Sequence, residues 1–130
     1  MPANCRIVFP AVVAAALCCG ALPARSDELP TRIGACGETT IKFLGGRLEG
    51  DTTFETGTAV LYDNGGVQIS YDREEGAIMS RVGDPVRLCL VSIPEDCPPG
   101  DDRGKVYAAT NLRTGATWEM PDSAHMCGGA

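Results

Sequence analysis

Histidine is almost absent from this sequence. It occurs once in 130 residues, at His125, and no paired Cys-x-x-Cys motif accompanies it. A structural zinc site requires several His or Cys ligands at characteristic spacing, so we do not expect a zinc site. Ser123 and Asp122 neighbour His125, but residues of one short tail after Pro121 are not expected to converge as a nucleophilic site.

Several chemical motifs are also missing. The sequence has no G-x-S-x-G elbow, no P-loop, no G-x-G-x-x-G fingerprint and no metalloprotease motif. Acyl transfer through a nucleophile elbow, nucleotide binding and zinc-dependent hydrolysis therefore have no support in the sequence. We predict no cofactor and no metal, and we lean against an enzyme.

Basic residues are scarce relative to acidic ones. The chain holds 11 Lys and Arg against 17 Asp and Glu, a formal net charge of -6. Binding to nucleic acid or to an anionic membrane draws on clustered Lys and Arg that release counterions. We therefore expect neither as a partner.

Long apolar runs are confined to the N-terminus. Arg6 is the only charge before an apolar run over residues 7–22, and small residues close that run at Ala21 and Ala24. This layout is typical of a secretory signal. The run is also shorter than the ~20 residues that a membrane span requires.

The N-terminal layout predicts a signal peptide over residues 1–24, cleaved after Ala24 or Ala21. It follows that the protein is exported, to the periplasm or out of the cell, and that the mature chain has no membrane span. An uncleaved anchor is one alternative. A lipoprotein modified at Cys18 or Cys19 is another.

Cysteine is plentiful, with 7 in the chain. Those outside the predicted signal peptide are Cys36, Cys89, Cys97 and Cys127. An even number of cysteines in a small exported domain indicates disulfides, here two with three possible connectivities. A set of free buried thiols is the alternative.

The clearest local signal is a β-hairpin. Residues 58–62 and 67–71 flank the turn Asp63-Asn64-Gly65-Gly66, and Asn-Gly accepts positive φ at both positions of a tight hairpin turn. The residues of the second strand alternate, so one set is expected to share a face opposite the other: Val67, Ile69 and Tyr71 against Gln68, Ser70 and Asp72.

Two further stretches are typical of strands. Residues 39–44 combine β-branched and aromatic residues, with Ile41 and Phe43 expected on one face. Residues 86–93 are apolar at both alternations, which favours a central strand buried on both sides. Residues 77–82 fit either a short strand or a helical turn, and no window carries a helical apolar stripe with caps, so we predict little or no helix.

A second hairpin is expected from residues 105–110 and 117–120, which flank a turn at 112–115. If the chain turns at the middle of that segment, Cys127 lies at the same end of the hairpin as Asp101. The C-terminal tail then comes close to the loop that precedes the hairpin.

This register favours one of the possible disulfide pairings. It brings Cys127 within a few residues of Cys97, which leaves Cys36 for Cys89. The rival pairing, Cys89 with Cys97 and Cys36 with Cys127, requires the loop to fold back along its own strand by ~13 Å. We therefore predict Cys97–Cys127 and Cys36–Cys89.

About six short strands separated by turn signals predict an all-β fold. We expect a small antiparallel β-barrel, with a compact sandwich as the alternative, because closure protects the edges of so small a sheet. The domain organisation that follows is a signal peptide over 1–24, a lead-in segment over 25–36 and one disulfide-stabilised β-domain over 37–130.

The loop before the second hairpin is stiffened by Pro98-Pro99 and carries several charges: Glu95, Asp96, Asp101, Asp102 and Arg103. Clustered oxygens suit calcium, and paired carboxylates can act as acid and base. The spacing matches no EF-hand, and Arg103 competes with any cation, so a solvated and partly self-paired loop is the alternative. Asp101, Asp102 and Arg103, with Arg113 at the hairpin tip, form the candidate binding surface.

The C-terminal part of the chain contains GDPVRLCLVSIPEDCPPGDDRG, then NLRTG, a single Trp and PDSAHMCGG. This block, which covers the last third to half of the chain, resembles that of a group of small, exported, uncharacterised bacterial proteins. The resemblance implies a bacterial protein of the periplasm or the medium. It implies no activity, substrate or catalytic residue.

We therefore expect a non-enzymatic binding module of the cell envelope that recognises a protein or a glycan. One rival expectation is a small enzyme or enzyme inhibitor that uses the acidic loop from Glu95 to Asp102. The other is a calcium-binding domain.

Overall fold

The structure is a computed structural model that describes residues 10–16, 20 and 27–129. Most of the predicted signal peptide, with its cysteines, lies outside the described residues. The parts of it that are described carry no helix or strand and are exposed. Within the described residues, no helix is long and apolar enough to cross a membrane.

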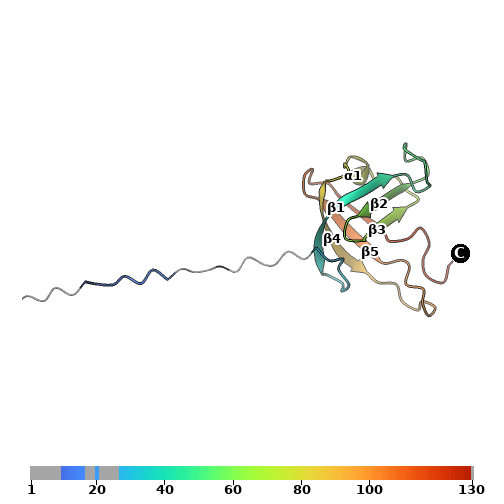
Figure 1. The fold of residues 1–130 in the computed structure, drawn as a ribbon. Coiled ribbons are helices and arrows are strands. Elements are labelled where there is room, and N and C mark those ends of the chain that lie inside the picture. The colour runs from blue at the N-terminus through green and yellow to red at the C-terminus, as the bar shows by residue number, and fades with distance from the viewer. Residues whose placement is uncertain (1–9, 17–19, 21–26, 130) are drawn as a thin grey trace, which may run out of the picture.

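Six antiparallel strands form one sheet in the order β3-β2-β1-β4-β5-β6. The sheet curls into a half-barrel, and a single helical turn lies between β3 and β4 in the chain (Figure 1). The expected all-β class with little helix is confirmed. The elements are β1 (Cys36–Gly45), β2 (Thr58–Tyr62), β3 (Val67–Ser70), α1 (Glu75–Ile78), β4 (Pro85–Ser92), β5 (Val106–Asn111) and β6 (Thr117–Pro121).

Strand β1 pairs with two strands in succession. Its first half, from Cys36 to Thr40, pairs with β4, and its second half, from Ile41 to Gly45, pairs with β2. A register shift between Ile41 and Phe43 lies at the start of the second half. Such a bulge re-aims the side chains that follow it: Ile41 is buried, whereas Phe43 is 46% exposed. The expectation that these two side chains share a face is therefore wrong.

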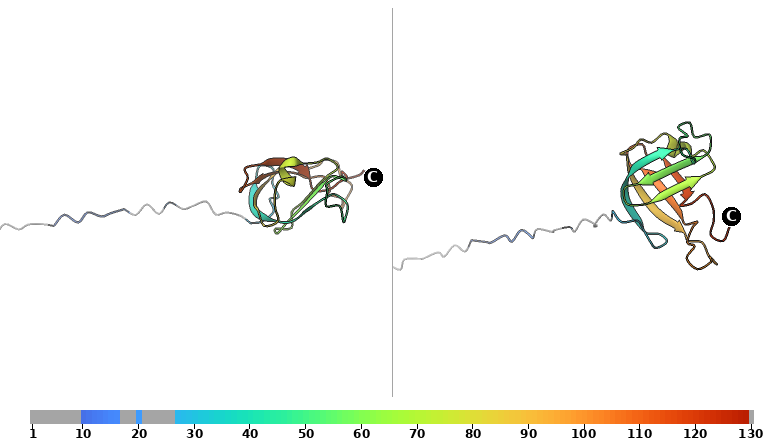
Figure 2. Two further views of the ribbon diagram at one scale, coloured as in Figure 1. Left: turned by 90° about the horizontal axis from the view of Figure 1, so that it is seen from above. Right: turned by 45° about the vertical axis from the view of Figure 1, so that its right-hand side comes forward.

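The core fills the concave side of the curled sheet. Figure 2 shows β2 and β3, in green, on one side of this interior and β5 and β6, in orange to red, on the other. Burying a large apolar side chain stabilises the fold by about 1.5–3 kcal/mol. The large residues of the core are Ile41, Val60, Tyr62, Val86, Leu88, Leu90, Tyr107, Trp118 and Met120.

Strand β4 lies in the middle of the sheet, between β1 and β5, as expected of a central strand. Only one of its faces is buried: Leu88 and Leu90 point into the core, while Arg87 and Val91 are exposed. The expectation of burial on both sides is wrong, because the convex face of a single curled sheet meets solvent.

Strand β3 shows the predicted alternation, with Gln68 on its buried face. Gln68 is fully buried, Val67 and Ile69 are half-buried on the opposite face, and Tyr71 is 55% exposed. Of the polar set, Gln68 alone is buried, while Ser70 is half-buried and Asp72 is exposed. The reason for the burial of Gln68 lies in the hydrogen bonds that this glutamine makes.

The Gln68 amide connects the two ends of the sheet. Its Oε1 accepts hydrogen bonds from the Tyr62 hydroxyl at 2.6 Å and from Trp118 Nε1 at 2.9 Å. Its Nε2 donates to the carbonyl oxygens of Tyr107 at 2.7 Å and Met120 at 3.3 Å. Because the donor and the acceptor are both satisfied, the amide can be buried without an orphaned polar group.

Short segments cover the two ends of the half-barrel. At the end where β2 begins, α1 places the fully buried Ala77 against the core. At the end where β2 stops, Leu29 of the lead-in segment packs on the core beside Leu88. A Cβ at Gly66 would lie 3.1 Å from Leu29 Cδ1 and 3.2 Å from Leu88 Cδ1, so the lead-in segment packs closely on this turn.

Two disulfides are present, Cys36–Cys89 and Cys97–Cys127. They are the pairs that the hairpin register favours, and Tyr107 faces Met120 in that register. The first disulfide joins β1 to β4. The second ties the C-terminal tail to the loop before β5.

Candidate functional site

The structure divides the predicted binding surface between the two ends of β5. Asp101, Asp102 and Arg103 precede this strand, whereas Arg113 follows it in the turn to β6. The side chains of the two groups have different partners. The four residues therefore do not form one surface.

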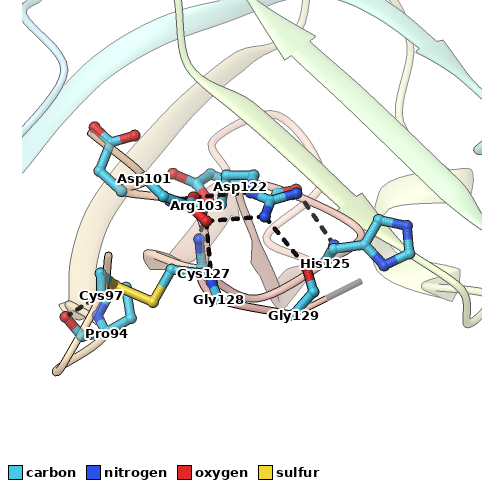
Figure 3. A network of polar contacts seen from close by, with 12 residues as sticks. Pro94, Cys97, Asp101, Arg103, Asp122, His125, Cys127, Gly128 and Gly129 are labelled. Atoms are coloured by element: carbon cyan, nitrogen blue, oxygen red, sulfur yellow. Dashed lines mark hydrogen bonds and ion pairs between the residues drawn. A yellow bond between two sulfur atoms is a disulfide. The ribbon is translucent and has the colours of Figure 1, made fainter. Parts of the chain in front are cut away.

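Asp101 and Arg103 pair with each other (Figure 3). Arg103 Nε lies 2.8 Å from Asp101 Oδ1, and Nη2 lies 2.9 Å from Oδ2. This two-pronged contact, with a further hydrogen bond from the Gly128 N–H, holds the pKa of Asp101 well below its usual range. Asp102 is different: its side chain is 86% exposed and lies 3.5 Å from Lys105 Nζ.

The C-terminal tail is fastened to this pair (Figure 3). The Cys127 N–H donates to the Arg103 carbonyl at 2.9 Å, and the Gly128 N–H donates to Asp101 Oδ2 at 3.0 Å. The Cys97–Cys127 disulfide adds a covalent connection. Asp101 and Arg103 thus hold the C-terminal tail in position.

The same contacts bear on cation binding. Both carboxylate oxygens of Asp101 already accept hydrogen bonds from protein donors. Across residues 10–16, 20 and 27–129, no group of three or more His, Cys, Asp or Glu side chains is placed to hold a metal ion.

Arg113 is paired with a residue that sequence reasoning missed. Its Nε and Nη2 lie 2.6 Å and 2.8 Å from the two carboxylate oxygens of Asp84. Asp84 is 5% exposed and comes directly before β4. Hydrogen bonds from Arg113 and Asn111 hold the pKa of this buried carboxyl well below its usual range.

A polar network surrounds the buried side of Asp84. Asn111 Nδ2 donates to Asp84 Oδ2 and to Ser80 Oγ, both at 2.9 Å, and Ser80 Oγ donates to the Gly76 carbonyl at 3.0 Å. Asn111 Oδ1 accepts from the Arg113 N–H at 2.8 Å. These residues connect the helical turn α1 to the tip of the second hairpin. The hydrogen bonds between them occupy their polar groups.

His125 contacts the aromatic ring of Tyr71, which also packs against Arg47. Its ring centroid lies 6.1 Å from that of Tyr71, edge to face, and Arg47 Cζ lies 4.1 Å from the Tyr71 centroid. The His125 main-chain N–H lies 3.3 Å from Ser123 Oγ. This cluster packs the tail against Tyr71, the residue that follows β3.

An open groove of about 560 Å³ lies where the lead-in segment, the first half of β1 and the turn between β2 and β3 meet. We call it the β1 groove. Its wall combines carboxylates, hydroxyls, one amide and one apolar ring. The lining residues are Asp27, Glu38, Thr39, Thr40, Asp63, Asn64 and Pro85.

The hairpin turn positions the polar groups of the β1 groove. The Thr40 hydroxyl donates to Asp63 Oδ2, and the Asn64 N–H donates to Thr39 Oγ1 at 3.1 Å. Asn64 Oδ1 accepts from the Gly66 N–H at 3.0 Å. Asn64 Nδ2, by contrast, is buried and has no hydrogen-bond partner in the structure.

The β1 groove can both donate and accept hydrogen bonds. Its carboxylates accept and its threonine hydroxyls do either, while the Asn64 Nδ2 donor lies buried at its wall. A buried donor without a partner costs about 1–3 kcal/mol. A ligand oxygen that reached Asn64 Nδ2 would recover part of that cost.

Sequence reasoning missed this groove because its wall is assembled from distant segments. Asp27 and Pro85 lie far apart in the chain and meet only when the lead-in segment and β4 pack beside β1. The available signal was the turn at Asp63 and Asn64. This turn predicts a hairpin. Both residues also carry polar side chains that a turn leaves near solvent.

Comparisons with known proteins add no identification: no known protein family, no curated protein and no solved structure matches this chain.

Proposed function

We propose that this protein is an exported, non-enzymatic binding module of the cell envelope whose β1 groove binds a glycan. Two disulfides in a small β-domain fit an oxidising compartment. The N-terminal apolar run with its closing alanines supports export.

One observation carries the assignment to the groove. The Asn64 Nδ2 donor has no partner, and its residue lines the groove together with acceptors and hydroxyls that the hairpin turn holds in place. Each hydroxyl of a sugar can accept one hydrogen bond and donate another. A pair of neighbouring hydroxyls could therefore accept from Asn64 and donate to Asp63 or Glu38.

The framework of the groove favours binding without a large rearrangement. Its β1 wall, Glu38–Thr40, pairs with β4, and the Cys36–Cys89 disulfide joins the same two strands. A preorganised site loses less conformational freedom on binding. The functions considered for the acidic loop are not proposed, because Asp101 is bound to Arg103 and to the tail.

The test is an NMR titration of the isotope-labelled full chain with a β-linked N-acetylglucosamine tetramer. We expect saturable shifts of the Thr39, Thr40 and Asn64 amide signals. An Asn64→Asp variant keeps the acceptor for the Gly66 N–H and removes the Nδ2 donor. It should bind about tenfold more weakly, which corresponds to ~1.4 kcal/mol.

The matched control is Asp102→Asn, which changes an exposed carboxylate outside the groove and should bind like the parent. The same titration is repeated with a lysine-containing and an arginine-containing peptide. Shifts in the groove with the peptides alone would replace the glycan by a basic protein segment. Shifts outside the groove with every probe would contradict the assignment of the site.

A further inference from the structure

The Cys36–Cys89 disulfide joins residues that already face each other on neighbouring strands. The Leu90 N–H donates to the Ala35 carbonyl at 3.0 Å, so the next pair along the ladder is a hydrogen-bonded one. Antiparallel ladders alternate, which places Cys36 and Cys89 at a non-hydrogen-bonded position, where strands approach most closely. Their Cα atoms are 4.0 Å apart, below the usual ~4.4–6.8 Å of disulfides.

The other disulfide provides an internal comparison. The Cα atoms of Cys97 and Cys127 are 5.4 Å apart, close to the commonest separation. All four cysteines are half-buried. The two disulfides therefore differ in the separation of their Cα atoms and much less in solvent exposure. A separation outside the usual range makes a disulfide easier to reduce.

The sulfur atoms of the first disulfide lie on the convex face of the sheet. Gly37 and Leu88, the neighbours of the two cysteines in sequence, are buried on the concave side, and successive side chains of a strand alternate between faces. The residue that faces Cys89 from β5 is Ala108. Its methyl group is small, and neither cysteine is fully buried.

We propose that Cys36–Cys89 is a thiol–disulfide exchange site for an external dithiol, such as a dithiol oxidoreductase of the envelope. A thiolate of the dithiol attacks one sulfur of the disulfide, and the other cysteine leaves as a thiolate and takes up a proton. The second thiolate of the dithiol then attacks the mixed disulfide. Cys36 and Cys89 gain two electrons and two protons as thiols, and the dithiol becomes a disulfide.

The exchange leaves the fold in place. Strands β1 and β4 remain paired from Cys36 to Thr40 through their main chains. The core residues of the two strands lie on the other face. Reduction of this disulfide therefore changes the chemistry of the convex face without opening the half-barrel.

The experiment uses the full chain, with all free thiols first blocked by iodoacetamide. Dithiothreitol is added at native pH, and samples taken over time are trapped with N-ethylmaleimide and digested with trypsin. Cys89 and Cys97 share the tryptic peptide 88–103, so the reporters are Cys36 in peptide 33–42 and Cys127 in peptide 114–130. We expect Cys36 to be labelled about tenfold faster than Cys127.

Circular dichroism of the partly reduced protein, and of a Cys36→Ser/Cys89→Ser variant, monitors the fold. The proposal requires an unchanged β-sheet spectrum while Cys36 is labelled and Cys127 is not. Labelling of Cys127 first, or of both cysteines at equal rates, would overturn it. Labelling of Cys36 only as the spectrum is lost would overturn it as well, because the disulfide would then open by unfolding.

Discussion

At the residue scale, Gln68 supplies a connection that the main chain of the sheet does not. Strands β3 and β6 are the two ends of the strand order, and the side chain of Gln68 on β3 reaches the Met120 carbonyl on β6 and the Trp118 indole beside it. In the low-dielectric interior, a fully satisfied polar group of this kind fixes one arrangement of its neighbours. The half-barrel therefore depends on a glutamine for its closure.

Replacing Gln68 with leucine should destabilise the fold. The substitution leaves the buried Tyr62 hydroxyl and Trp118 N–H without their acceptor, and each buried group left unpaired costs about 1–3 kcal/mol. We expect the free energy of unfolding, measured by urea denaturation, to fall by about 2–4 kcal/mol. Glu119→Gln, on the exposed face of β6, should change it by less than about 0.5 kcal/mol. A leucine variant as stable as the parent would show that the amide is dispensable.

At the scale of elements, the two hairpins could be predicted from the sequence, whereas the buried faces of β1, β3 and β4 could not. The Asn-Gly turn and the alternation after it determine the pairing of β2 with β3, and the second hairpin follows from its turn in the same way. Periodicity identifies two faces but does not say which one is buried. For β3 the answer depends on Tyr62 and Trp118, which lie on other strands.

Contacts between residues far apart in the sequence explain the other differences between prediction and structure. The side chain of Phe43 points outward because β1 changes partner beside it, and a change of partner has no signature within six residues of one strand. The sequence places Arg113 at a hairpin tip and predicts it as part of a binding surface. Its carboxylate partner Asp84 is 29 residues away in sequence, and nothing in the local pattern joins them. The lead-in wall of the β1 groove was unpredictable for the same reason.

A substitution at Gly57, which directly precedes β2, tests how closely the start of β2 packs against the end of β3. Its φ is +119°, and a Cβ there would overlap the Ser70 carbonyl oxygen and lie 2.9 Å from Tyr71 Cα. Gly57→Ala should therefore force β2 and β3 apart and lower the melting temperature substantially. The matched control is Gly115→Ala, at φ +76° with open space around it, which should show only the ~1–2 kcal/mol strain of a left-handed residue. Equal losses in the two variants would contradict the packing argument.

At the scale of the whole molecule, folding stability should depend on acid pH. Asp84 and Asp101 have pKa values lowered in the folded state, chiefly by hydrogen bonds from Arg113 and Arg103 respectively. A carboxyl group with a lowered folded pKa stabilises the fold above its unfolded pKa, near ~3.9 for aspartate. That stabilisation is lost as the pH falls through the lower, folded value.

An Asp84→Asn variant should therefore lose stability at pH 7 and lose less than the parent on acidification. We expect about 1–3 kcal/mol less free energy of unfolding at pH 7, the range for a buried group whose partners no longer match. Urea denaturation at pH 7, 5 and 3 measures both effects. Asp102→Asn, at an exposed position, should reproduce the pH profile of the parent. A parallel, downward-shifted profile for Asp84→Asn would argue against the role of its charge.

The disulfide connectivity has a consequence for biogenesis. Cys36 pairs with Cys89 and Cys97 pairs with Cys127, so the two closed loops follow one another along the chain and neither encloses the other. A chain that crosses a membrane from its N-terminus presents these four cysteines in that order. An oxidase that joins each cysteine to the next one to emerge would then produce the native pairs directly. If the chain is exported as proposed, maturation of this domain would need an electron acceptor for its thiols but no isomerase to correct them.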